Sequence, residues 1–253
     1  TSVASCMSLP ILPSRPEPPG PSDLVRFFPR TELHWCRQLA DESGLDVGAA
    51  LLNGSLAALA DANQILDAAL PDGWSPTQAV QSVDAHFAAS ALRCLRWTMN
   101  PSQPQQRTQP LAQHLLAQGF EPHASDILYL YGQPRVDVRE VGGLTIIPAR
   151  ASFRHARQLA ERQADEIKSP AQADAFMLHL EDAQTDALLA IENDEAVAIA
   201  AVLSAGEIGR IDQLYVSSTH RHQGVGRTML SRAMEICARS LFKHVLVRVD
   251  PEN

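Results

Sequence analysis

The residues best suited to chemistry form the octapeptide HRHQGVGR, residues 220–227. It joins an apolar run, IDQLYV, to an amphipathic run, RTMLSRAMEICARSLF, so we expect a strand before it and a helix after it. Gly224 and Gly226 then fall in the first helical turn, where backbone N–H groups lack intrahelical acceptors and attract anions. Arg221 and Arg227 add positive charge there. The pattern predicts a phosphate-binding loop, although two glycines alone also suit an ordinary tight turn.

Two common phosphate-binding motifs do not fit this segment. A P-loop requires GxxxxGK[ST], and the residues after Gly226 are Arg227 and Thr228, without the first glycine of that motif. A dinucleotide fingerprint requires GxGxxG, but Met229 stands where its third glycine belongs. A nucleotide-dependent enzyme is therefore disfavoured.

Residues 136–253 are predicted to have the element order β-α-α-β-β-β-α-β. The two first helices are expected in SFRHARQLAERQADE and SPAQADAFMLHLEDA, the last helix over about 223–240, and the last strand in HVLVRVDP. Short turns between the three central strands imply antiparallel pairing, and the helix before the last strand implies a parallel crossover. The fold class predicted is α+β, with a mixed, mostly antiparallel sheet flanked by helices.

The motif R/Q-x-x-G-x-G/A, present as Arg221 to Gly226, together with this element order resembles the GCN5-related N-acetyltransferase (GNAT) family. The resemblance extends over roughly residues 140–253. It implies an acyl-CoA N-acyltransferase fold and an enzyme that transfers an acetyl or other small acyl group from acetyl-CoA to an amine through a direct-attack ternary complex. A non-catalytic acyl-CoA-binding regulatory or scaffold module is the alternative.

The resemblance also implies roles for individual residues. The strand before the loop would accompany the pantetheine arm, splay from the last strand, and polarise the acetyl carbonyl near Tyr215. Asp212 corresponds to the family's base, with a solvated structural residue as the alternative reading and Glu207 and His220 as weaker candidates. Asn253 would match an asparagine that follows the last strand. The residues implied to bind coenzyme A are Leu214, Tyr215, Val216, Arg221, His222, Gln223, Gly224, Val225, Gly226, Arg227, Thr228 and Asn253.

The sequence departs from the family after the last strand. Family members continue with a helix bearing a tyrosine that protonates the leaving thiolate and with two further strands, whereas this sequence ends RVDPEN. The segment RCLRWTMNPSQPQQRTQPLAQHLLAQGFEPHASDILYL in the first half is similar to that missing part. We therefore interpret residues 23–135 as a helix-rich, degenerate α/β domain of the same family in tandem, or as an unrelated helical domain. We expect residues 109–131 to pack beside the open edge of the second-half sheet.

The elements of the first half follow from local signals. Residues 1–22 are expected to form a Pro-rich arm, and a helix is expected from Thr31 through DESG. The run GAALLNGSLAALADANQILDAAL, residues 48–70, is expected to be helical, either as one helix or as two that are separated at Asn53-Gly54. Ser75 before Pro76 opens another helix. RCLRWTMNP and DILYLYG are expected to be strands, with the helix LAQHLLAQ between them.

Composition restricts the partners. The net charge of −8 disfavours nonspecific nucleic-acid binding, and no apolar run is long enough to span a membrane. The four cysteines are scattered without metal-ligand spacing, which predicts no metal site and favours a reducing cytoplasm. Cys237 lies on the apolar stripe of the last helix and is expected in the core. The partner predicted is a small-molecule or peptide amine.

Overall fold

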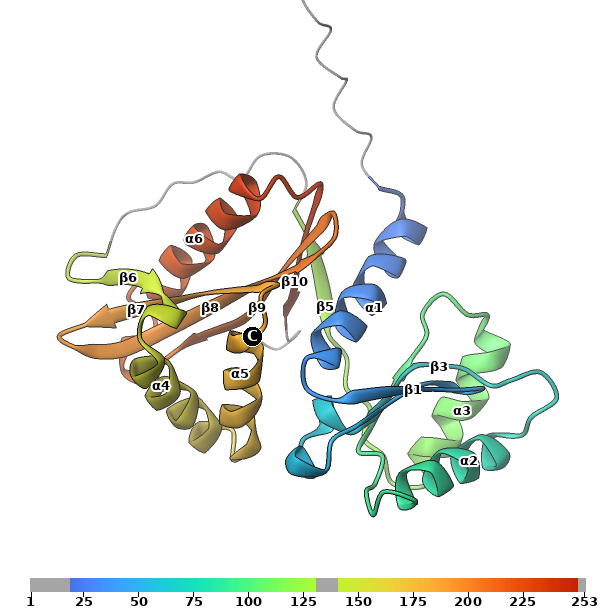
Figure 1. Cartoon of the computed structure of the whole chain (residues 1–253). Helices are drawn as coiled ribbons and strands as arrows, with labels where there is room; N and C mark the ends of the chain where they lie inside the picture. The colour runs from blue at the N-terminus through green and yellow to red at the C-terminus, as the bar shows by residue number, and fades with distance from the viewer. Residues whose placement is uncertain (1–18, 131–140, 250–253) are drawn as a thin grey trace, which may run out of the picture.

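A six-stranded mixed sheet forms the framework of the second half. The computed structural model of the chain describes residues 19–130 and 141–249 (Figure 1). The sheet has the order β5-β10-β9-β8-β7-β6, with β9 and β10 parallel and the other neighbours antiparallel. Its strands are β5 (Asp126–Tyr129), β6 (Thr145–Pro148), β7 (Thr185–Glu192), β8 (Glu195–Ala205), β9 (Ile208–Val216) and β10 (His244–Val249). The expected mixed, mostly antiparallel sheet is confirmed.

Helices cover both faces of this sheet because alternate residues of β8 are apolar on each side. Ala198, Ala200 and Val202 pack with α6 (Val225–Arg239) on one face. Ile199 and Leu203 face the opposite way, toward α4 (Phe153–Glu166) and α5 (Ala171–Glu181). Cys237 of α6 is buried in this cluster, as expected.

The first half contains its own four-stranded sheet of order β1-β2-β3-β4. The pairs β1–β2 and β2–β3 are antiparallel, and β3–β4 is parallel through a crossover that contains α2. Helices α2 and α3 share a core with this sheet. The elements are β1 (Asp41–Leu45), β2 (Gly48–Leu52), β3 (Gln64–Ala68), α2 (Pro76–Ala88), β4 (Arg96–Met99) and α3 (Gln105–Ala117).

Two sequence expectations for the first half are wrong. Residues 48–70 are not helical: β2 and β3 lie there, joined by two short 3₁₀ turns. The helix expected from Thr31 begins ten residues earlier, as α1 (Pro21–Arg37), and DESG belongs to β1. Ser75 does cap α2, where it forms a capping box with Gln78.

Two first-half elements pack onto the second-half sheet (Figure 1). β5 pairs antiparallel with β10, with Leu128 opposite Val247, so the expected edge packing of residues 109–131 is confirmed for the strand in that segment. α1 lies between the two sheets: its Trp35 and Cys36 share one buried cluster with Leu66 of β3 and Phe176 of α5. The boundary expected near 135 lies outside the described residues.

Candidate functional site

The loop between β9 and α6 has the conformation that an anion site requires. A 3₁₀ turn (Ser218–His220) follows β9, and His222 (φ 62°) and Gly224 (φ 87°) adopt left-handed backbone conformations before α6 begins at Val225. Gly224 is the N-cap residue, and no side chain of the described residues caps the first turn. The amides of Val225, Gly226 and Arg227 therefore stay free to bind an anion at the positive end of the helix dipole.

The structure narrows the predicted set of phosphate donors. The Thr228 amide donates to the Gly224 carbonyl oxygen at 3.0 Å, and the Thr228 hydroxyl donates to the same oxygen at 3.2 Å. The Gln223 side chain donates to the Thr219 carbonyl oxygen at 2.9 Å. Thr228 is thus occupied by the helix itself, which leaves residues 223–227 as the free part of the predicted loop.

Arg221 bends back toward β9. Its Nε donates to the Val216 carbonyl oxygen at 3.0 Å, and one terminal nitrogen lies 2.5 Å from a carboxylate oxygen of Glu166, at the end of α4. Its guanidinium also lies 5.8 Å from the centre of the Tyr215 ring. Sequence reasoning missed Glu166, because nothing local connects the end of α4 to this loop.

β9 and β10 part at the middle of β9. Their parallel pairing runs from Ile208–His244 to Ile211–Val247 and then stops. β10 continues to Val249, paired there with β5, while β9 continues to Val216, where β8 is its only partner strand within residues 19–130 and 141–249. Among the described residues, no strand pairs with β9 from Asp212 onward on the β10 side, although Arg221 Nε donates to the Val216 carbonyl oxygen. This gives a slot along Leu214, Tyr215 and Val216 that ends at the loop.

A bulge distorts β9 inside this slot. Ala201 pairs with Asp212 and Ile199 with Tyr215, so Gln213 and Leu214 of β9 stand opposite the single residue Ala200 of β8. Gln213 has a φ of 51°, and 41% of the Leu214 surface is exposed. Tyr215 instead packs in the core on the α4 side. Burial and the nearby Glu166 carboxylate raise the pKa of Tyr215 to about 12, so its hydroxyl stays protonated at neutral pH.

Asp212 lies at the point where the two strands part. One carboxylate oxygen lies 2.5 Å from a terminal nitrogen of Arg210, and the other accepts the Gln213 amide at 2.8 Å. Burial alone would raise the pKa of Asp212, but Arg210 and Arg248 outweigh it and hold the pKa below its ordinary value. A carboxylate held in this way is a weak proton acceptor, so the geometry favours a structural role over the base role.

The two weaker base candidates lie beyond opposite ends of β9. Glu207 is in the turn before β9, at the end opposite the loop, where it pairs with Lys243 at 2.6 Å. His220 is held inside the loop, by Ser217 at 2.8 Å and by Glu192 at 3.1 Å. Asn253 lies outside the described residues.

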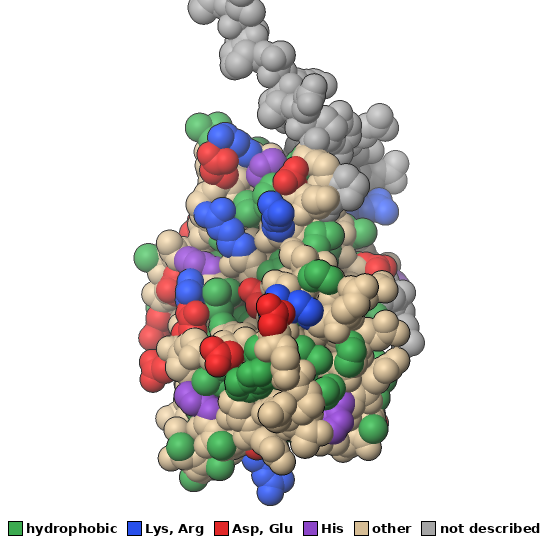
Figure 2. Space-filling model, turned by 90° about the vertical axis from the view of Figure 1, so that its right-hand side faces the viewer, with side chains coloured by type: hydrophobic (Ala, Val, Ile, Leu, Met, Phe, Trp, Pro, Cys, Tyr) green, Lys and Arg blue, Asp and Glu red, His purple; other side chains and the backbone are tan. Residues whose placement is uncertain are grey.

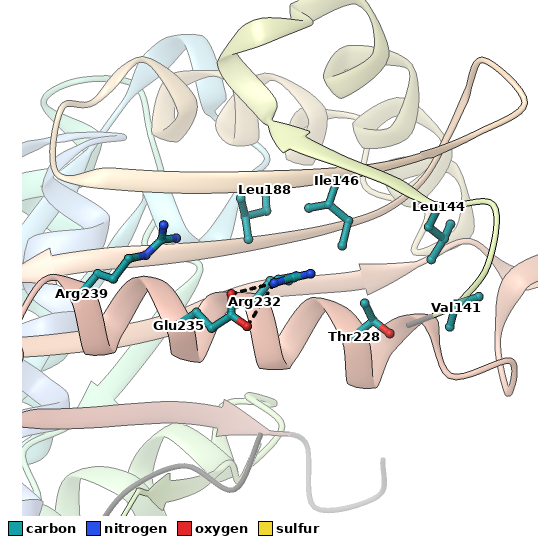
Figure 3. Close-up of a pocket in the computed structure, with 8 residues that line it drawn as sticks. All are labelled: Val141, Leu144, Ile146, Leu188, Thr228, Arg232, Glu235 and Arg239. Atoms are coloured by element: carbon teal, nitrogen blue, oxygen red, sulfur yellow. Dashed lines mark hydrogen bonds and ion pairs between the residues drawn. The ribbon is translucent and has the colours of Figure 1, made fainter. Parts of the chain in front are cut away.

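A separate hollow lies on the α6 face of the sheet (Figure 3). Leu144, Ile146 and Leu188 point from the sheet toward α6, where Arg232 and Glu235 pair at 2.9 Å. On the α1 side instead, Arg210 contacts both Asp212 and Glu32, and Arg248 contacts Glu32. The hollow is therefore distinct from the slot. Among the described residues, no cluster of His, Cys, Asp and Glu is arranged to hold a metal ion.

Comparison with known proteins identifies the domain. Residues 151–253 match the sequence model of the acetyltransferase (GNAT) family. These residues form a GNAT domain. A comparison with the curated proteins found no match. The GNAT domain thus contains β9, the loop and α6, as the sequence motif predicted.

Solved structures extend the similarity beyond the GNAT domain. A GCN5-related N-acetyltransferase from Kribbella flavida matches with a TM-score of 0.59 at 15% identity, over 89% of this chain and 85% of that one. This match includes most of the first half, so both halves share the fold of that protein. Two further structures match only part of this chain. One is a predicted acetyltransferase with acetyl-CoA from Clostridium acetobutylicum, with a TM-score of 0.36 at 16% identity over 43% of this chain and 82% of that one. The other is an aminoglycoside acetyltransferase in complex with sisomicin from a soil metagenome, with a TM-score of 0.38 at 16% identity over 44% of this chain and 80% of that one.

Proposed function

We propose that this chain transfers an acetyl or small acyl group from acetyl-CoA to an amine. The observation that carries the proposal is the slot between β9 and β10, which opens at Asp212 and ends at the uncapped first turn of α6. A strand edge with free backbone groups beside a helix N-terminus suits a ligand that combines an amide-containing arm with a pyrophosphate. The GNAT family of the domain agrees with this chemistry.

The loop residues fit the pyrophosphate of coenzyme A. A Cβ added at Gly226 would lie 3.5 Å from the Val216 side chain, in ordinary contact, so folding alone does not require glycine there. An anion that must approach the backbone amides closely would explain why residue 226 has no side chain. Gln223, Gly224, Val225, Gly226 and Arg227 would hold the pyrophosphate, flanked by Arg221 and His222.

The slot itself would position the thioester that acetyl-CoA supplies. Leu214 and Val216 would pair with the pantetheine arm as a strand does. The bulge leaves the backbone just before Tyr215 outside the β8 pairing, and amide groups there would stabilise the negative charge that develops on the acetyl oxygen. The proton of the attacking amine would pass to water, since Asp212 is held by Arg210.

The first half would then be a degenerate domain of the same family. Its β2-β3-α2-β4 order, with β3 and β4 parallel, repeats β8-β9-α6-β10. The first turn of α2 is closed by its own capping box, in which Ser75 accepts the Gln78 amide at 3.3 Å. That helix lacks the free amides of α6, so we propose coenzyme A binding in the second half alone.

We propose an amine on a small molecule or peptide as the acceptor. The net charge of −8 disfavours polyanionic acceptors. On the side that Figure 2 shows, Lys and Arg side chains are interspersed with Asp and Glu. Among the described residues no helix is long and apolar enough to cross a membrane. The described cysteines are unpaired and buried, which supports a cytoplasmic location within this proposal.

Acetyl-CoA binding to Gly226 variants tests the proposal. Isothermal titration of the wild-type chain with acetyl-CoA should show one site. Gly226→Glu should abolish binding, because it places a carboxylate where the phosphates would lie. Gly226→Ala is the matched control, and it should retain the fold and at least part of the affinity, because its Cβ has room. If wild type and Gly226→Glu bind acetyl-CoA with equal affinity, the loop is an ordinary turn and does not hold the pyrophosphate.

Release of free coenzyme A thiol separates an enzyme from a binding module. The wild-type chain is mixed with acetyl-CoA and a panel of amines, and thiol release is followed with a chromogenic disulfide. Release that depends on one amine class supports transfer. Tight binding without release for any amine supports the regulatory module instead.

A further inference from the structure

Four charged side chains form a cluster where the two halves meet, with Arg210 and Glu32 buried and Asp212 and Arg248 partly buried. Arg210 of β9 lies 2.5 Å from Glu32 of α1 and 2.5 Å from Asp212, and Arg248 of β10 lies 3.2 Å from the other Glu32 oxygen. The Arg210 side chain is fully buried, and its guanidinium also lies 5.0 Å from the centre of the Phe28 ring. The cluster thus connects α1 to the two strands that border the slot.

Stability is a poor explanation for this cluster. Removing ions from water costs several kcal/mol per ion, and apolar side chains of similar volume often stabilise a fold as well as a buried ion pair does. An ion pair instead fixes geometry, because a guanidinium holds a carboxylate in one orientation. We therefore infer the role of the cluster from the group whose orientation it fixes.

The group that it orients is the bulge of β9. Asp212 is the first residue of β9 beyond the last pair with β10, Ile211–Val247. Its Oδ1 accepts the amide of Gln213, whose φ of 51° is unfavourable for a residue with a side chain. Its Oδ2 is held by Arg210. Arg210 thus fixes the carboxylate that stabilises the bulge.

We propose that Asp212 is a positioning residue, and that Glu32 of the first half sets the geometry of the acyl site through Arg210, Asp212 and the Gln213 amide. The inference rests on the proposed function, because it concerns the β9 amides assigned to the acyl group. It differs from the base hypothesis in what the carboxylate does: it accepts a backbone hydrogen bond and does not accept the substrate proton. It also gives α1 a role in the chemistry of the other half.

Asp212 variants distinguish positioning from base catalysis. Asn keeps an oxygen that can accept the Gln213 amide but cannot accept a proton, whereas Ala can do neither. Positioning predicts that Asp212→Asn keeps a kcat at least about tenfold above that of Asp212→Ala, since small misplacements at a reacting centre cost one to two orders of magnitude. Equal and near-complete loss of kcat in both variants, with both still folded, would overturn positioning in favour of a base.

Glu32 variants test the connection between the halves. Glu32→Ala should lower kcat about tenfold with the Kd for acetyl-CoA changed less than about twofold, because the loop that holds the pyrophosphate stays intact. Glu32→Gln keeps a hydrogen-bond acceptor and should therefore retain part of the kcat that Glu32→Ala loses. It replaces Glu32→Ala in this test if the alanine variant does not fold. Glu207→Gln is the control, because it removes an exposed carboxylate at the other end of β9. Wild-type kcat in folded Glu32→Ala would overturn the connection.

Hydrogen exchange supplies a readout that needs no turnover. The amides of residues 212–217 should exchange faster in Glu32→Ala than in wild type, while Glu207→Gln leaves them unchanged. If the wild type neither binds nor consumes acetyl-CoA, the proposed function fails, yet this exchange result still tests the mechanical connection. Unchanged exchange at residues 212–217 in folded Glu32→Ala would overturn the inference by itself.

Discussion

His179 of α5 shows how one side chain can make the stability of this fold depend on pH. It is buried, stacks on Trp35 with 3.5 Å between ring centroids, and its Nδ1 lies 2.6 Å from the Gln38 side-chain oxygen. Burial lowers its pKa to about 3. An unfolded histidine takes up a proton below about pH 6.5, whereas the folded one stays neutral, so protonation favours the unfolded chain.

The stability of the wild-type chain should therefore fall as the pH falls from about 6.5 toward 3. The contribution of His179 approaches about 1.4 kcal/mol per pH unit within that window. Urea unfolding at pH 7.5 and 5 measures the difference, and His179→Gln should show a smaller pH dependence than wild type. His123→Gln is the control, since His123 is exposed in a loop and should leave the dependence unchanged. The same pH dependence in wild type and His179→Gln would contradict the expectation.

At the scale of elements, local signals predicted the strand, loop and helix from β9 to α6 better than they predicted the elements of the first half. The loop and α6 were predictable because glycine conformations and helix starts are decided within a few residues. The hairpin at 48–68 was not, because an Ala- and Leu-rich run suits a helix until its partners are known. Gly48 is an example of a residue whose role depends on a distant partner, because a Cβ there would lie 2.4 Å from the Leu66 carbonyl oxygen. That contact exists only once β2 has paired with β3.

The ion cluster was missed for a related reason. The period of two in a strand puts Arg210 and Asp212 on one face of β9, and a charged pair in an apolar run indicates a buried partner. The partner, Glu32, is 178 residues away in the chain. No spacing rule connects them, so the sequence could indicate the need for a partner but not its identity.

β5 offers a test of an element that crosses between the halves. Leu128 is 52% exposed, so a substitution there acts mainly through the backbone. The Leu130 amide donates to the Val245 carbonyl oxygen, and the antiparallel alternation gives Leu128 the next hydrogen-bonded position, opposite Val247. Leu128→Pro removes that donor and should destabilise the fold by about 1–3 kcal/mol.

Urea unfolding measures this effect, with Leu128→Ala as the control. Alanine removes the exposed side chain but keeps the N–H group, so it should cost much less than proline. If Leu128→Pro is as stable as Leu128→Ala, the pairing of β5 with β10 contributes nothing to the fold.

At the scale of the whole molecule, the two halves share one core. Trp35 of α1 and Leu51 of β2 lie in the same buried cluster as Phe176 and Leu203 of the second half. A separate GNAT domain would lose α1 from one sheet face and β5 from one sheet edge (Figure 1). An uncovered apolar face and an open strand edge both promote aggregation.

Residues 141–253 produced alone should therefore fail to fold, although they contain the whole family match. We expect this fragment to be insoluble, or soluble but without a cooperative urea transition, whereas residues 19–253 unfold cooperatively. Residues 19–130, produced in the same cells, should rescue it, because they bring α1 and β5. The rescue should weaken when the partner fragment carries Leu128→Pro and persist with Leu128→Ala. The opposite result is a monomeric fragment 141–253 that unfolds cooperatively at the same urea concentration as the longer chain. It would show that the GNAT domain folds without the first half, and that α1 and β5 are not needed for its stability.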